Sequence, residues 1–197
     1  MNWQSLLKDF KNFLKFERNL SDNTIESYGL DILKLINHSK ENKLSLKVNS
    51  IKNSDIREFI FQQSKQLSSN SQSRLISSLK KFFDYLIIEK IINENPVDNI
   101  EYPKIGLRIP NTLTTSEIDE IINFLGKSKK NSARNTAITE VLYSCGLRVS
   151  ELINITISDI FFDEFLIKIL GKGNKERFVP MSKMAKEMIK EYINTER

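Results

Sequence analysis

The segment that most constrains this fold is residues 93–110, which holds three of the chain's four prolines and no sustained helical or strand period. Proline lacks a backbone N–H and restricts the residue before it, so a regular element rarely runs through such a segment. We therefore predict an extended linker. The chain of 197 residues divides into a first domain at 1–90, a linker at 91–110 and a second domain at 111–197.

Four stretches before the linker repeat apolar residues at spacings of three and four, which indicates amphipathic helices. Ser21 and Ser54 precede the second and third helices, and the serine-rich residues 68–73 are expected to form the turn before the fourth, at about 71–89. The residues expected to face inward are Trp3, Leu6, Leu7, Phe10, Phe13 and Leu14; Ile25, Tyr28, Ile32, Leu33 and Ile36; Ile56, Phe59 and Ile60; and Leu75, Leu79, Phe82, Phe83 and Leu86. Four such helices with short connections predict a compact bundle.

Helices are also expected after the linker. Thr114 and Glu117 have the spacing of a capping box. A second helix is expected over about 131–145, because Gly146 can end it in the left-handed conformation. Ser182 precedes a last helix, whose expected inward residues are Met184, Met188, Ile189 and Tyr192.

A β-hairpin is expected between these last two helices, after a short helix at about 150–154. Phe165, Ile167 and Ile169 alternate with their neighbours as in a strand, and the glycine-rich residues 171–175 turn the chain into a second strand at 177–180. The predicted fold class is therefore mostly α with a small β-hairpin or sheet, in which a four-helix domain precedes an α+β domain.

Composition excludes several classes of protein. No apolar run approaches the roughly 20 residues of a membrane span, so no membrane partner is expected. The single cysteine cannot form an internal disulfide, which fits a cytoplasmic location, and one histidine with one cysteine cannot build a usual zinc site. The net charge of +5 permits a nucleic-acid partner, although it equally suits a soluble protein without one.

Arg148 is placed where its side chain can project from the surface. It follows Gly146 by two residues, at the turn between two expected helices. A guanidinium can donate to two phosphate oxygens at once and stays charged at physiological pH. The alternative is that Arg148 bonds the carbonyls at the end of the preceding helix, as cations there commonly do.

Lys172 lies in the glycine-rich turn of the expected hairpin, Gly171-Lys-Gly-Asn-Lys175. Glycine permits positive φ and a close approach to a ligand, so a lysine here can reach a phosphate or a leaving oxygen. The alternative is an ordinary exposed hairpin tip. A nucleotide-binding P-loop is not indicated, because its Gly-x-x-x-x-Gly-Lys-[Ser/Thr] pattern is absent and this turn joins two strands.

Taken together, the stretch Arg148-Val-Ser-Glu-Leu152 and residues 171–180 closely resemble the catalytic domain of tyrosine recombinases, the phage-integrase family, and look nearest to its Xer branch. Residues 20–28 are similar to the start of the family's helical core-binding domain. Residues 95–103 and 113–117 are similar to its linker and to the entry of its catalytic domain. The resemblance spans nearly the whole chain and implies a SAM-like core-binding domain followed by part of the catalytic domain.

The resemblance implies a role for each matching residue. Arg148 matches the first catalytic arginine, which holds the scissile phosphate and stabilises charge in the transition state. Lys172 matches the hairpin lysine that protonates the departing 5′ hydroxyl. Glu151 matches an acidic position that supports the site, or is a helix-capping glutamate. Lys175 and Arg177 match contacts to the DNA backbone, or are solvated hairpin charges.

The fourth helix of the first domain carries a polar face opposite its apolar one. Similar helices of the family lie in the major groove, where polar and cationic side chains contact phosphates and base edges. The resemblance therefore implies double-stranded DNA as the partner, clamped by the two domains, although a plain solvated face is the alternative. The residues concerned are Arg74, Ser77, Lys80 and Lys81.

The chain departs from the family pattern after the hairpin. The family uses a His-x-x-Arg pair, a further His or Trp and a tyrosine nucleophile there, and no such set follows residue 180. Tyr192 and Tyr143 are expected to be buried in helices, and His38 to lie on the surface of the first domain. A nucleophile must stand in line with the leaving oxygen, so we expect this truncated chain to be catalytically incomplete and to form no covalent adduct with DNA.

Two main hypotheses follow from the resemblance. Complete members of the family carry out site-specific recombination as tetramers on DNA, through 3′-phosphotyrosyl intermediates and a Holliday junction, without metal or nucleotide cofactors. The first hypothesis is that this chain is part of such a recombinase. The second is a non-catalytic DNA-binding relative that modulates a full-length recombinase. A third, outside the family, is an unrelated helical DNA-binding module.

Overall fold

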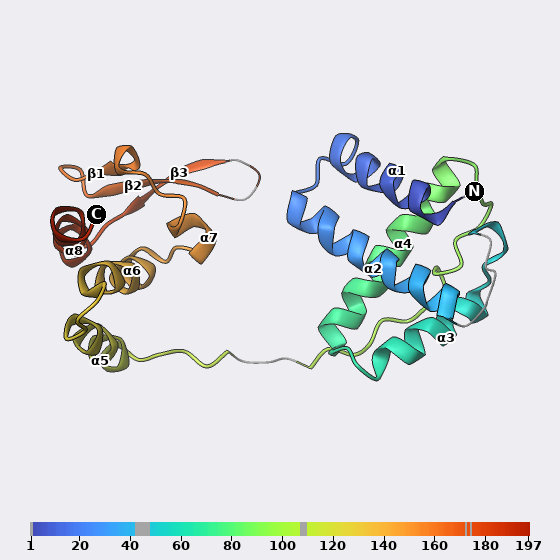
Figure 1. Ribbon diagram of the computed structural model, residues 1–197, viewed down its shortest axis with the longest axis horizontal. Coiled ribbons are helices and arrows are strands. Elements are labelled where there is room, and N and C mark those ends of the chain that lie inside the picture. The colour runs from blue at the N-terminus through green and yellow to red at the C-terminus, as the bar shows by residue number, and fades with distance from the viewer. Residues whose placement is uncertain (1, 42–47, 107–109, 172, 174) are drawn as a thin grey trace. The chain divides into compact units, whose positions relative to one another are not determined.

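The chain folds into two compact units, residues 1–108 and 109–197, in the computed structural model (Figure 1). The structure describes residues 2–41, 48–106, 110–171, 173 and 175–197. The predicted fold class is confirmed, because the described part is mostly helical with one small antiparallel sheet. The predicted domain boundaries stay a prediction, and the division between the two units falls inside the expected linker.

The described residues of the first unit form four α-helices: α1 (Trp3–Phe16), α2 (Asp22–Glu41), α3 (Asn53–Ser64) and α4 (Ser69–Ile88), with a 3-10 turn at Val48–Ser50 between α2 and α3. Ser68 caps α4, because its side chain accepts a hydrogen bond from the backbone N–H of Ser71. The serine run at 68–73, expected to be a turn, is therefore mostly helical. The cap, not the run, is the signal that marks the start of α4.

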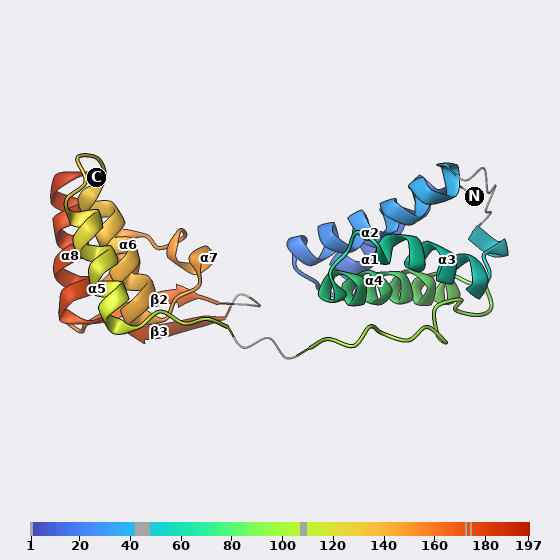
Figure 2. The ribbon, with the colours of Figure 1, turned by 90° about the horizontal axis from the view of Figure 1, so that it is seen from below.

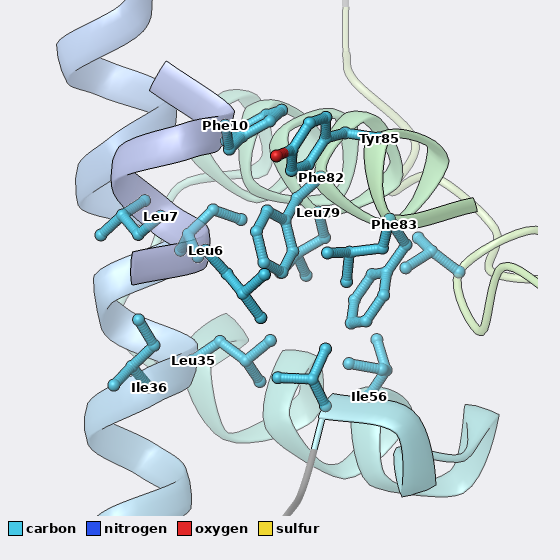
Figure 3. Close-up of a cluster of buried hydrophobic side chains, with 14 of the residues drawn as sticks. Leu6, Leu7, Phe10, Leu35, Ile36, Ile56, Leu79, Phe82, Phe83 and Tyr85 are labelled. Atoms are coloured by element: carbon cyan, nitrogen blue, oxygen red, sulfur yellow. The ribbon is translucent and has the colours of Figure 1, made fainter. Parts of the chain in front are cut away.

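The core of the first unit lies between α4 and the other three helices, as Figure 3 shows for 14 of its side chains. Phe82 of α4 is fully buried, with its ring centroid 5.2 Å from that of Phe10 and 6.2 Å from that of Trp3. The apolar stripes predicted for the four helices are confirmed as members of this core, although Trp3, Tyr28 and Leu33 are only partly buried in it.

The first half of the predicted linker packs on the helices of the first unit. Val97 is buried in its core, and Asn95 donates to the carboxylate of Asp84 at 2.8 Å and to the carbonyl of Lys80 at 3.1 Å. Asn53 donates to the carbonyl of Pro96 at 2.7 Å. The last of these bonds satisfies the carbonyl of Pro96, a backbone group that lies outside any helix. Residues 95–97 are therefore part of the first unit.

The expectation that His38 lies on the surface was wrong. His38 is in the last turn of α2 and is buried, with its ring centroid 5.1 Å from that of Phe59 in α3. The helix runs further than the sequence pattern suggested, so this histidine packs between two helices.

In the second unit, the residues that the structure describes form four α-helices and a three-stranded antiparallel sheet in the order β1-β2-β3. Helix α6 contacts both α5 and α8, and α6 and α8 cover one face of the sheet (Figures 1 and 2). The elements are α5 (Thr115–Gly126), α6 (Ser132–Cys145), α7 (Val149–Leu152), a 3-10 turn at Ile157–Asp159, β1 (Ile160–Phe161), β2 (Leu166–Leu170), β3 (Glu176–Pro180) and α8 (Lys183–Thr195).

The sheet confirms the predicted hairpin and adds a strand. Ile167 pairs with Val179 in the β2–β3 register and with Ile160 of β1. Ile167 and Ile169 are buried against the helices, as their alternation predicted. Strand β1 was missed because two residues are too few to show a period.

In the second unit, only some of the helix residues that were predicted to be buried are buried. Cys145, the last residue of α6, is buried, and burial raises the pKa of its thiol. Tyr143 and Met184 were expected to face inward, but both are exposed. Tyr192 lines an apolar pocket of about 310 Å³ between α6, α8 and the sheet, together with Ile189 and other aliphatic side chains.

Within the described residues, every helix is too short or too polar to serve as a membrane span.

Candidate functional site

The turn that carries Arg148 is built by Gly146. Helix α6 ends at Cys145, and Gly146 follows in the left-handed conformation with φ of 61°. Arg148 then begins α7 as its N-cap, with extended backbone and a side chain that is 71% exposed. Among the described residues its guanidinium bonds Glu151 and not the carbonyls at the end of α6, so the helix-end alternative is wrong.

Glu151 is the centre of this site. Its side chain is 5% exposed, yet four N–H groups point at its carboxylate. The backbone N–H of Arg148 donates at 2.9 Å and its Nη1 at 2.9 Å, while Nη1 and Nη2 of Arg177 donate at 2.9 and 3.0 Å. Each carboxylate oxygen therefore accepts two hydrogen bonds. Glu151 is a helix cap and an ion-pair partner at once.

These donors favour the ionised form of the carboxyl group. Arg177, followed by the backbone N–H of Arg148, lowers the pKa of Glu151 from 4.5 to about 2. The same contact raises the pKa of Arg177. At neutral pH the cluster holds two guanidinium groups against one carboxylate, which leaves one net positive charge on a surface where Arg148 is exposed. Such a surface favours an anion.

The hairpin turn begins next to this cluster. The backbone N–H of Gly171 donates to the carbonyl of Lys175 at 2.8 Å, and Gly173 has φ of 76°, as expected of a glycine in such a turn. Lys175 is exposed. Lys172, the predicted general acid, lies outside the described residues.

The ionisation of Glu151 gives the second unit a defined pH dependence. Because its pKa is lowered in the folded state, the stability it contributes is present above pH about 4.5 and is lost as the pH falls through about 2. We expect Glu151→Gln to lower the urea midpoint at neutral pH, and we expect that deficit to shrink over this window. Unfolding followed by circular dichroism at a series of pH values measures it. Glu164→Gln, which removes an exposed carboxylate of the same unit, is the matched control, and a deficit that stays constant down to pH about 2 would contradict the prediction.

The polar face of α4 is paired with neighbouring side chains. Lys80 forms an ion pair with Asp98 at 3.0 Å, and Ser77 lies 3.4 Å from the hydroxyl of Tyr102. Both partners come from the segment that follows α4. Lys81 is exposed and forms no ion pair with any residue that the structure describes.

Arg74, on the same helix, is held by a buried acid. Asp31 of α2 is fully buried, and its Oδ1 lies 3.4 Å from Nη2 of Arg74 and 3.0 Å from Nζ of Lys34. Its Oδ2 accepts from the hydroxyl of Ser78 at 2.9 Å. A buried carboxylate is stable only when its oxygens are satisfied in this way. The network ties α2 to α4 and fixes two cations at their junction.

Comparison with known proteins identifies the family. The sequence model of the Phage integrase family matches residues 111–197, and that of the Phage integrase, N-terminal SAM-like domain matches residues 7–90. A tyrosine recombinase XerD from Oceanobacillus iheyensis is 37% identical over 192 residues, 97% of this chain. The chain belongs to the phage integrase family.

Relatives within the phage integrase family are longer than this chain. A tyrosine recombinase of Pseudothermotoga lettingae is 40% identical over 98% of the chain, which covers 66% of that relative. The chain covers 64% of the Oceanobacillus XerD. It therefore spans slightly less than two thirds of the length of these curated relatives.

Solved structures of an integrase and of a site-specific recombinase share the fold. A lambda integrase dimer bound to a COC′ core site is similar with a TM-score of 0.74 at 19% identity, over 99% of this chain and 70% of that one. The XerH recombinase bound to a palindromic difH substrate is similar with a TM-score of 0.69 at 23% identity, over 95% of this chain and 57% of that one.

In this member of the phage integrase family the structure brings together three of the residues proposed from the sequence, Arg148, Glu151 and Arg177. Their roles in the chemistry stay predictions. Arg177 is not a solvated hairpin charge, because both of its terminal nitrogens bond Glu151. The residues proposed on α4 lie along one helix of the first unit, and Arg74, Ser77 and Lys80 each have a partner there.

Sequence reasoning missed Asp31 and Asp98. Asp31 falls on the inward stripe of α2 with Tyr28 and Leu35, and a charged residue on an apolar stripe is a signal of a buried ion pair. Asp98 gave no such signal, since it follows a proline in a segment without a period.

Proposed function

We propose that this chain acts in site-specific DNA recombination and binds duplex DNA through both of its units. The observation that carries the proposal is the pair of guanidinium groups, Arg148 and Arg177, on one buried carboxylate beside a glycine-rich turn. Relatives of the phage integrase family with this level of identity are named tyrosine recombinases.

The chemistry proposed for the second unit is phosphate binding by Arg148. Its guanidinium is mostly exposed, and because only Nη1 bonds Glu151, its remaining N–H groups are directed to solvent or a ligand. Two such donors fit two oxygens of one phosphodiester. Glu151 holds the guanidinium in place, and Lys172 protonates the leaving oxygen in the role that the family resemblance gives it.

The first unit contributes the polar face of α4. Arg74 and Lys80 are held in place by acids, and Lys81 is exposed, so all three offer cations to phosphates. Ser77, on the same face of α4, is the residue proposed to contact a base edge. Recombination by the whole protein involves further recombinase subunits on DNA. A lambda integrase tetramer bound to a Holliday junction is similar in fold, with a TM-score of 0.74 at 18% identity, over 99% of this chain and 57% of that one. A cytoplasmic location is part of the same proposal.

The test of DNA binding is a salt titration of duplex affinity, measured by fluorescence anisotropy. Each phosphate neutralised contributes about 0.9 to the slope of log affinity against log salt. We expect Lys81→Gln to reduce this slope by about that amount. Lys8→Gln, which removes an exposed charge from α1, is the matched control and is expected to leave the slope unchanged. Affinity that does not depend on salt, or equal effects of the two variants, would refute this mode of binding.

Asp98 competes with phosphate for Lys80 if α4 contacts DNA. The two side chains are 3.0 Å apart and both are partly exposed, and Asp98 raises the pKa of Lys80. An exposed ion pair contributes only a small free energy, because water screens both charges. We therefore expect Asp98→Asn to raise duplex affinity about two- to fivefold at low salt, in the same anisotropy assay.

The control for this prediction is Glu101→Gln. Glu101 is an exposed acid of the same segment, and it forms no ion pair with the described residues. If the two variants raise affinity equally, the gain comes from net charge alone, and the competition for Lys80 is disproved.

A further inference from the structure

Arg177 makes a contact that a DNA-binding residue does not need. It lies on β3 opposite Ile169, near the base of the hairpin turn. Its two terminal nitrogens donate to the two oxygens of Glu151 in a bidentate pair, at 2.9 and 3.0 Å. A planar guanidinium in this arrangement fixes the orientation of the carboxylate as well as its charge.

The carboxylate that Arg177 holds is the one that holds Arg148. Glu151 accepts from the backbone N–H and from Nη1 of Arg148, both at 2.9 Å. Because Glu151 is buried and each of its oxygens already accepts two bonds, it cannot rotate without breaking some of them. The position of Arg148 therefore depends on the position of Arg177.

The hairpin turn packs directly on this guanidinium. A Cβ atom built on Gly171 would lie 2.8 Å from Nη1 of Arg177 and 4.0 Å from Oε1 of Glu151. Gly171 also closes the turn, through its N–H bond to the carbonyl of Lys175. The absence of a side chain at position 171 lets Arg177 lie between the turn and Glu151.

Resting on the proposed function, we infer that Arg177 is a positioning residue, which acts through Glu151 to fix Arg148 relative to the base of the hairpin turn, and that it does not contact the DNA backbone. The contacts form one continuous series, in which Gly171 packs on Arg177, Arg177 bonds Glu151, and Glu151 bonds Arg148. These contacts set how far Arg148 lies from Gly171, the first residue of the hairpin turn.

The first test needs no DNA. NMR of the full chain can follow the carboxyl carbon of Glu151 through a pH titration and the Nε–Hε signal of Arg148. We expect Arg177→Lys to raise the pKa of Glu151 from about 2 toward 4.5 and to shift the Arg148 signal, since lysine keeps the charge but lacks the fork. Lys175→Gln, a change in the same turn, is expected to alter neither signal. Unchanged signals in Arg177→Lys would overturn the inference.

The second test is a double-mutant cycle on duplex affinity. If Arg177 acts through Glu151, Arg177→Lys weakens binding by about tenfold in the wild-type chain, because Arg148 loses its geometry, and by less than about twofold in an Glu151→Gln background. A direct phosphate contact predicts the same change in both backgrounds, and that result would overturn the inference.

The two tests separate this inference from the proposed function. If the chain does not bind DNA, the proposed function fails, while the NMR signals still report whether Arg177 positions Glu151 and Arg148. If the chain binds DNA and the NMR signals do not respond to Arg177→Lys, only the positioning role fails. Circular dichroism of each variant establishes that the second unit is folded when these signals are read.

Discussion

Replacing Phe82 with alanine is expected to lower the free energy of unfolding of the first unit by about 3–5 kcal/mol. Phe82 is fully buried on α4 and its ring meets those of Phe10, Phe83 and Trp3. The change removes a large apolar side chain and leaves a cavity that α1 cannot fill without moving. The fluorescence of Trp3, the chain's single tryptophan, reports this loss directly in a urea titration.

Phe16→Ala is the matched control for that change. Phe16 ends α1 and its side chain is largely exposed, so its removal is expected to change the free energy of unfolding by less than about 0.5 kcal/mol. Equal effects of the two substitutions would mean that the packing around Phe82 does not hold the bundle together.

The second large effect is expected at Asp31. Removing one partner of a buried ion pair costs about 3–5 kcal/mol. The side chains of Lys34 and Arg74 are 35% and 41% exposed, so both can be rehydrated, which places Asp31→Ala near about 3 kcal/mol. The measurement is the free energy of unfolding of the first unit by urea.

Two further substitutions test the reason for this loss. Asp31→Asn keeps an acceptor for Ser78 and is expected to be less damaging than alanine. Asp22→Asn removes an exposed acid that pairs with Lys15 at the same distance of 3.0 Å, and its cost is expected to stay below about 1 kcal/mol. If Asp22→Asn costs as much as Asp31→Ala, burial is not what makes Asp31 important.

The helices of this chain were predictable because their signals are local. The apolar residues of α1 and α4 recur at helical spacing, and the capping box of Thr114 and Glu117 marks the start of α5, where the structure shows both of its hydrogen bonds. Gly146 ends α6 with positive φ as expected. Each of these features is decided within a few residues of the chain.

The ion-pair partners and the burial of individual helix residues could not be predicted, because they depend on contacts between residues far apart in the sequence. Arg177 and Glu151 are 26 residues apart, and Asp31 and Ser78 are 47 apart, so no local pattern could pair them. Tyr143 and His38 were misplaced because helical spacing gives the side of a helix but not which sides other elements cover. Arg148 and Lys172 were singled out from their glycine turns, the roles of the proposed site residues came from the family resemblance, and their contacts came from the fold.

Because Cys145 is buried, the rate at which its thiol is alkylated reports how often the second unit opens. The chain has one thiol, it lies at the end of α6 in the core of this unit, and burial raises its pKa, so few thiolates are available while the unit stays closed. Alkylation must then wait for the unit to open, and its rate measures how often that happens. Because α6 leads directly into Gly146 and Arg148, the same rate also reports how often the turn that carries Arg148 loosens.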